Sequence, residues 1–254
     1  MTVAARADLL AYVTALGDDA LMLGQRLSEW VSRAPTLEEE LSLGNVALDY
    51  IGRARLCYRY AARLADDGRG EDDFAYRRDC RDFTNLLITE LPRGDFAFTT
   101  VRQFLVDAFE VPFMAALAQC PDVDLAAIGA QGLPEAQYHL RRSRDWMLRL
   151  GDGTADSRSR MQNALEALWG YTAELFEAPQ AERRLADTAS VPDRRAFEAS
   201  WRETIATTLR AATLTEPTAT WRVGGGRDGI HTEHLGHLLA ELQFVQRAYP
   251  GLSW

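Results

Sequence analysis

Helical periodicity is the feature that most limits what this chain of 254 residues can fold into. Apolar residues recur three and four positions apart over long stretches, which gives each stretch the single apolar face of an amphipathic helix. The four longest such stretches are residues 9–30, 36–64, 95–120 and 124–150. They form two pairs, each joined by a connection of a few residues, and long antiparallel pairs without a sheet are typical of a helix bundle. The sequence therefore predicts an all-α bundle.

Shorter helical stretches accompany the four long ones, and they are residues 72–90, 154–177, 193–213 and 231–248. Thr36 followed three residues later by Glu39 forms a capping box for the second long helix. Pro134 should kink or break the fourth, because proline has no amide hydrogen to donate. Only residues 218–223 look like a strand, and one strand makes no sheet. No long flexible linker divides the chain, so we predict a single domain, residues 1–254.

Charge and cysteine content exclude several classes of function. The formal net charge is -9, which disfavours nucleic acid or an anionic membrane as a partner. All 28 basic residues are arginine, so a lysine Schiff base and a phosphate-loop lysine are excluded. Cys57, Cys80 and Cys120 lack any paired spacing and are predicted to be buried thiols in a reducing compartment. With no charge-free stretch of 18 residues and no signal-peptide pattern, we expect a cytoplasmic protein without a membrane span.

Several acidic residues stand where a bundle could use them to hold metal. Ferritin-like di-iron proteins place one carboxylate on the first helix of each pair and a carboxylate-x-x-His motif on the second, because residues i and i+3 share a face. The positions with matching spacing are Asp19, Asp49, Gly52, Asp107, Glu135 and Tyr138. Gly52 and Tyr138 stand where the motif requires histidine. The carboxylates therefore fit the di-iron pattern and the histidines do not.

The count of histidines decides against two irons. Of the four in the chain, His231, His234 and His237 lie in the last helical stretch. Only His139 falls within the four long segments, one position later than the motif requires. We therefore predict that this chain contains no metal site, no cofactor site and no catalytic residue, and that the positions above are the remains of a lost di-iron site.

The acids that remain need partners or water, because a bare carboxylate is costly inside a bundle. Arg53 lies four residues after Asp49, and His139 lies four residues after Glu135, so each pair is within reach along a helix. For Asp19 and Asp107 the sequence leaves two interpretations open, a buried polar network or a solvated helix face.

The stretch VGGGRDGIHTEHLGH, residues 223–237, combines a glycine pattern with three histidines. Its G-x-G-x-x-G spacing lacks the βαβ context and the later acidic residue of a dinucleotide site. His231, Glu233 and His234 could hold zinc, but no further ligand lies close by in sequence. We interpret the stretch as a loop leading into a helix that Asp228 or Thr232 caps.

Extended segments also resemble a known family. They are ALGDDALMLGQRLSEWVSRAPTLEEELSLGNVALDYIGRARLCYRYAARLA, RDFTNLLITELPRGDFAFTTVRQFLVDAF, EAQYHLRRSRDWMLRLGDGT and GIHTEHLGHLLAELQFVQRAYPGLSW. Together they resemble the PaaC-type structural subunit of the bacterial phenylacetyl-CoA 1,2-epoxidase. The resemblance extends from about residue 9 to Trp254.

This resemblance implies a ferritin-like bundle with additional C-terminal helices. It also implies a role as the non-catalytic structural subunit of a multicomponent monooxygenase in phenylacetate catabolism, which uses NADPH and oxygen. The implied partners are a ferritin-like catalytic subunit with the di-iron centre, a small bridging subunit, and a reductase with FAD and an iron–sulfur cluster.

Two other functions remain open at this point. One is an independent di-iron oxidase with an unusual ligand set of Asp49, Asp107, Glu135 and His139. The other is a free-standing module for an acyl-CoA, whose phosphates could meet the arginines at residues 141–144.

Overall fold

The computed structural model describes residues 2–218 and 220–252, and most of them are helical. They form no β-strand, so the all-α class predicted from the sequence is confirmed and the strand-like pattern at 218–223 was misleading. None of the described helices is long and apolar enough to cross a membrane.

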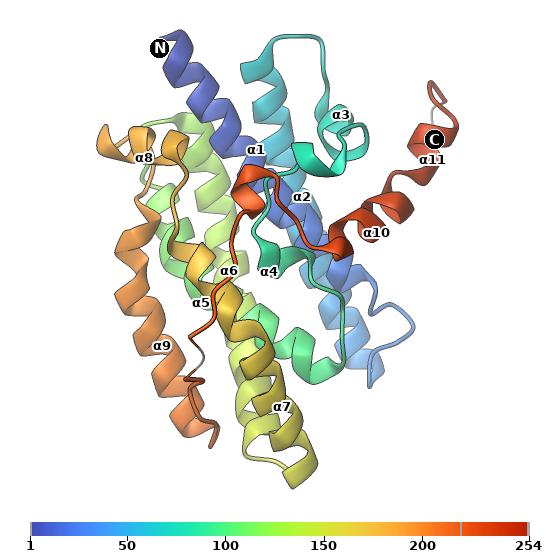
Figure 1. The fold of residues 1–254 in the computed structure, drawn as a ribbon, viewed down its shortest axis with the longest axis vertical. Helices are drawn as coiled ribbons and strands as arrows, with labels where there is room; N and C mark the ends of the chain where they lie inside the picture. Colours follow the sequence, from blue (N-terminus) through green and yellow to red (C-terminus); the bar gives the residue numbers. More distant parts are fainter. Residues whose placement is uncertain (1, 219, 253–254) are drawn as a thin grey trace. The chain divides into compact units, whose positions relative to one another are not determined.

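The structure divides into two compact units, and each draws on segments far apart in sequence. Unit 1 consists of residues 1–31, 41–92 and 224–254, and unit 2 consists of residues 32–40 and 93–223. Each unit contains one of the long antiparallel helix pairs (Figure 1). The single domain expected from the sequence stays a prediction.

Unit 1 is built on the pair formed by α1 and α2. Its helices are α1 (Val3–Ser28), α2 (Leu37–Ala65, whose first four residues belong to unit 2), α3 (Glu71–Tyr76), α4 (Leu87–Glu90), α10 (Glu233–Leu242) and α11 (Phe244–Ala248), with 3₁₀ helices at Cys80–Asp82 and Gly226–Asp228.

Two glycines let α1 and α2 approach closely. A Cβ atom at Gly17 would lie 2.6 Å from the Tyr58 ring, and one at Gly24 would lie 3.2 Å from the Ala47 carbonyl oxygen. As residue numbers rise along α1 they fall along α2, so the two helices run antiparallel. The predicted cap of α2 is present, because the Glu39 N–H donates to Thr36 Oγ1 at 3.3 Å.

The stretch 72–90 differs from the single helical piece predicted. It contains α3, the 3₁₀ helix Cys80–Asp82 and α4, separated by irregular chain. The reason is tertiary, because the backbone N–H groups of Thr84 and Leu86 donate to Asp18 and Asp19 on α1. Amides bound to side chains of another helix cannot also form a helix of their own.

Unit 2 is built on the pair formed by α5 and α6, which pack along much of their length. Its helices are α5 (Phe96–Leu117), α6 (Val123–Gly151), α7 (Ala155–Leu168), α8 (Gln180–Asp187) and α9 (Glu198–Ala211), with 3₁₀ helices at Trp169–Phe176 and Arg194–Phe197. The helix predicted for 154–177 is thus α at first and 3₁₀ after Leu168.

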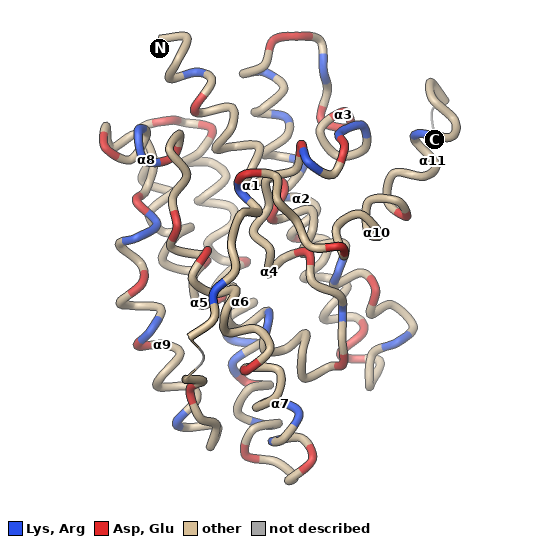
Figure 2. Tube along the Cα trace, in the orientation of Figure 1, with Lys and Arg blue, Asp and Glu red and all other residues tan. Residues whose placement is uncertain are grey.

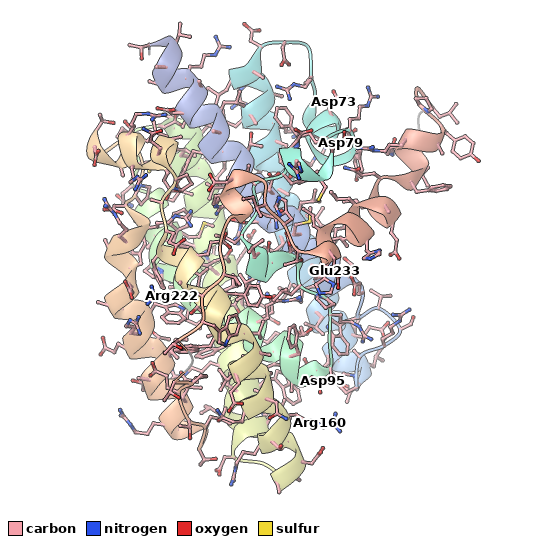
Figure 3. All side chains as sticks on the ribbon, in the orientation of Figure 1. Asp73, Asp79, Asp95, Arg160, Arg222 and Glu233 are labelled. Atoms are coloured by element: carbon pink, nitrogen blue, oxygen red, sulfur yellow. The ribbon has the colours of Figure 1, made fainter. Side chains whose placement is uncertain are left out.

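Side chains fix the ends and the packing of these helices. Asp95 caps α5 by accepting from the Phe98 N–H at 2.8 Å, and it also forms an ion pair with Arg160 of α7 at 3.3 Å (Figure 3). The Trp201 ring N–H donates to the Leu105 carbonyl at 2.8 Å, which anchors α9 on α5. Along α9, acidic and basic residues alternate (Figure 2).

The predicted break at Pro134 does not occur, and α6 continues through it. Pro134 lies on the exposed side of the helix, where water can bind the carbonyl that loses its amide partner. A proline in that position leaves the α5–α6 contact uninterrupted.

Candidate functional site

The acids of α1 are held in a polar network within unit 1. Asp18 is fully buried and accepts from the Tyr58 hydroxyl at 2.6 Å, the Thr84 N–H at 2.8 Å and the Arg78 guanidinium. Burial lowers the pKa of Arg78, but the Asp18 carboxylate outweighs this and the net pKa is raised. Burial and the same carboxylate raise the pKa of Tyr58 far above its usual range. Asp18 is therefore a structural anchor, which the sequence did not single out.

Asp19, one of the predicted site positions, binds the C-terminal segment. Its carboxylate accepts from Arg227 Nη2 at 2.5 Å and from the Leu86 N–H at 2.7 Å. Arg227 also donates to the Thr84 carbonyl at 2.6 Å. Of the two interpretations left open for Asp19, the polar network is the one that the structure shows, with the side chain half-buried.

Glu90 and His231 form a buried ion pair in unit 1. One Glu90 oxygen accepts from the Thr232 N–H at 2.6 Å and the Thr232 hydroxyl at 2.7 Å. The other lies 2.9 Å from Asn85 Nδ2 and 2.7 Å from His231 Nδ1. His231 Nε2 lies 2.8 Å from the Phe83 carbonyl oxygen. The backbone carbonyl can only accept, so Nε2 carries a proton, and when Glu90 is ionised and His231 is protonated the two side chains form an ion pair.

Both ring nitrogens of His231 face protein groups, Nδ1 toward Glu90 and Nε2 toward the Phe83 carbonyl. Burial lowers the pKa of His231, but its bonds to Glu90 and to the Phe83 carbonyl outweigh that effect and raise it. Thr232 caps α10, because its hydroxyl accepts from the His234 N–H at 3.3 Å, which confirms one of the two predicted caps. Through His231 and Thr232 this segment binds Glu90 of α4 and anchors the start of α10.

The α2 positions expected to face a lost metal site are Asp49 and Gly52, and only Asp49 has a side chain that could bind a metal. Asp49 is half-buried, and a Cβ atom at Gly52 would meet nothing within 4 Å. Arg53 is buried, with its guanidinium 5.0 Å from the Tyr50 ring centroid. The predicted contact between Asp49 and Arg53 stays a prediction.

Unit 2 brings three possible metal ligands together. One ligand atom each from Asp107, Glu110 and His139 lies within 4.8 Å of the others, and all three side chains are buried. Asp107 Oδ2 also accepts from the Ser143 hydroxyl at 2.7 Å. Asp107 is thus in a buried polar cluster rather than on a solvated face. The sequence pointed to Asp107 and His139 but missed Glu110, although the spacing of three between Asp107 and Glu110 is a signal for one helix face.

The other two predicted positions of α6 lie outside this cluster. Glu135 is half-buried, and its carboxylate lies 3.5 Å from Gln131 Nε2. Tyr138 is exposed, and the Arg141 guanidinium covers its ring at 5.6 Å from the centroid. Unit 2 thus groups Asp107 and His139 with Glu110, and the ligand set of Asp49, Asp107, Glu135 and His139 stays a prediction.

Cysteine chemistry has no support at neutral pH. Burial raises the pKa of Cys57 to about 12 and that of Cys120 to about 11, so neither thiol is ionised near neutrality. Cys57 is buried as predicted, whereas Cys80 and Cys120 are only half-buried.

A di-iron centre does not fit the donors that the structure describes. Such a centre takes a carboxylate from each of two helices and a carboxylate-x-x-His motif from each of two others. Unit 2 offers two carboxylates and one imidazole, and in unit 1 Asp19 already binds Arg227 while Gly52 has no side chain. These donors are too few for two irons.

A family described as "Phenylacetic acid catabolic protein" matches residues 1–254. The chain is also 46% identical over 246 residues to the C subunit of the 1,2-phenylacetyl-CoA epoxidase of Escherichia coli (strain K12), covering 97% of this chain and 99% of that protein. Because the match extends over the whole sequence, this chain is a member of the phenylacetic acid catabolic protein family.

Proposed function

We propose that this chain is the non-catalytic structural subunit of a phenylacetyl-CoA epoxidase and stabilises the subunit that carries the di-iron centre. The observation that carries the proposal is the similarity to the E. coli epoxidase protein over nearly the whole of both chains. The donor set supports it, because Asp107, Glu110 and His139 are too few ligands for the two irons that oxygen activation would use.

In this role the chain works in the cytoplasm within a complex. Its partners are a ferritin-like catalytic subunit with the di-iron centre, a small bridging subunit, and a reductase with FAD and an iron–sulfur cluster. The complex uses NADPH and oxygen to epoxidise the aromatic ring of phenylacetyl-CoA. This chain contributes no cofactor to that reaction, and its buried ion pairs keep the helices in the arrangement that the catalytic subunit recognises.

An exposed stripe on α2 is a suitable surface for that subunit. Leu41 and Leu48 are 61% and 66% exposed, and Gly44 and Gly52 lie beside them at helical spacing with open space above each. Glycine inside a helix costs about 1 kcal/mol relative to alanine. Since no described atom lies within 4 Å of a Cβ placed at either glycine, a helix of the catalytic subunit that packs closely there would explain them.

Co-expression with the catalytic subunit tests the proposal. We expect this chain to be recovered with that subunit as a stable complex, and we expect the subunit expressed alone to be poorly soluble and low in iron. Leu48→Arg should reduce the recovered complex, whereas Val123→Arg, at an apolar residue of α6 that is 79% exposed, should not. A catalytic subunit that is soluble, iron-loaded and active alone would contradict the scaffold role.

Iron analysis of the isolated chain separates the proposal from the alternative oxidase. That alternative requires close to two irons per chain together with oxygen consumption by this chain alone. The structural subunit is expected to show neither.

A further inference from the structure

The cluster of Asp107, Glu110 and His139 lies inside unit 2. The three residues are 1%, 9% and 2% exposed, and one ligand atom of each lies within 4.8 Å of the other two. Each of the two carboxylates and the imidazole is close to both of the other groups. The three groups therefore form a cluster and not a single ion pair.

The sequence produces this geometry through one helix face and a fixed register. Asp107 and Glu110 are three residues apart on α5 and so project from the same face. His139 comes from α6, which runs antiparallel to α5. The register is set near one end, where a Cβ atom at Gly129 would lie 2.3 Å from the Ala118 backbone nitrogen.

The donor types select a class of ion. Ligand atoms lie about 2.0–2.2 Å from a zinc-sized ion, so two ligands of one ion are separated by roughly 3–4.4 Å. The ligand atoms of the three residues lie within 4.8 Å of one another, so small side-chain movements would bring their separations into that range. A mixed imidazole and carboxylate set suits first-row divalent ions from Mn²⁺ to Zn²⁺, whereas Mg²⁺ and Ca²⁺ prefer oxygen ligands alone.

Two neighbouring side chains resemble the surroundings of a metal site. The Ser143 hydroxyl donates to Asp107 Oδ2 at 2.7 Å, and such a bond orients a ligating carboxylate. Gln103, one turn before Asp107 on α5, is 2% exposed, and neither atom of its side-chain amide has a hydrogen-bond partner among the described residues. A buried amide without a protein partner can bind a water molecule, and that water molecule can complete the coordination of a metal.

We propose that Asp107, Glu110 and His139 bind one divalent transition-metal ion that stabilises the α5–α6 pair. This is a site for a single ion, and it shares only Asp107 with the ferritin-like positions. In the ferritin-like pattern, Glu135 would be paired with a histidine at position 138. Here His139 is paired with Glu110 instead. The proposed metal site concerns this chain alone and does not depend on the role of the chain in a complex.

Cobalt binding tests the proposal, because the visible absorption of Co²⁺ reports its coordination by protein ligands. The purified chain would be dialysed against a chelator, titrated with Co²⁺ and then with Zn²⁺. We expect absorption that saturates at one equivalent of Co²⁺ per chain and disappears when Zn²⁺ displaces it. The bound ion should also raise the melting temperature of the chain.

Matched variants locate the ion. Asp107→Asn and His139→Asn should abolish the cobalt absorption, and Ser143→Ala should weaken affinity by about tenfold or more with a similar spectrum. Glu135→Gln, one turn before His139 on α6 and outside the cluster, should bind like the natural chain. Circular dichroism confirms that each variant is folded. A folded natural chain without cobalt absorption, or the same absorption in His139→Asn, would overturn the proposal.

Discussion

Glu90 illustrates, at the scale of single residues, how a buried carboxylate is compensated in this chain. Its two oxygens accept from the N–H and hydroxyl of Thr232, from Asn85 and from His231. Four donors use the acceptor capacity of both oxygens, which is the condition for keeping a charge inside a protein. Glu90→Gln should therefore leave the His231 imidazolium buried without its counter-ion.

The pH dependence of stability follows from the His231 ring. Its pKa in the folded chain is raised above the value of about 6.5 expected when unfolded. The ion pair therefore contributes fully below about pH 6.5 and is lost as pH rises through the raised pKa. Urea unfolding at a series of pH values should show this decrease in the free energy of unfolding.

The matched variant identifies the group responsible. His231→Gln should remove this component of the pH dependence, and His237→Gln, at an exposed position of the same segment, should keep it. If His231→Gln kept the same pH dependence as the natural chain, the decrease would have to come from another group.

At the scale of helices, the approach of α6 to the end of α5 depends on a missing side chain. Gly129→Ala would place a Cβ atom against the Ala118 backbone, which cannot move as a side chain would. Overpacking of this kind costs roughly 1–3 kcal/mol. We expect chemical denaturation of the isolated chain to show a loss of that size.

Gly44 on α2 provides the control for this prediction. A Cβ atom there would meet nothing within 4 Å, so Gly44→Ala should stabilise the isolated chain by about 0.5–1 kcal/mol through helix propensity alone. Equal effects of the two substitutions would show that the close contact at Gly129 is not what limits its replacement.

The helix signals that sequence revealed were local ones. Thr36, Asp95, Thr154 and Thr232 each accept from a backbone N–H two or three residues later, as caps do. The stretch 72–90 was wrongly expected to be one helical piece because distant carboxylates on α1 bind its amides. Helix propensity depends on neighbouring residues and contains no information about such partners.

At the scale of the whole molecule, unit 1 is completed by the last segment of the chain. Residues 224–254 supply Arg227 to Asp19 and His231 to Glu90. Deleting them should leave both the buried Glu90 and the half-buried Asp19 without their main donors. We expect hydrogen–deuterium exchange to become faster in α1 and α4, while α5 and α6 of unit 2 keep their protection.

A shorter deletion is the control for this experiment. Removing residues 249–254 leaves α11 and both buried ion pairs in place, so exchange in α1 and α4 should match that of the full chain. If the long deletion left the exchange of α1 unchanged, the C-terminal segment would not be needed to hold unit 1 together.

The sequence alone determined the helical class, the positions of most helix ends and the shortage of histidines, because periodicity, capping and composition are properties of neighbouring residues. Tertiary structure decided which acids are paired, since the partners lie far away in sequence. Asp18 binds Arg78 across 60 residues, Glu90 binds His231 across 141, and Asp19 binds Arg227 across 208. The same holds for Glu110, which becomes part of a cluster only because α6 brings His139 beside it.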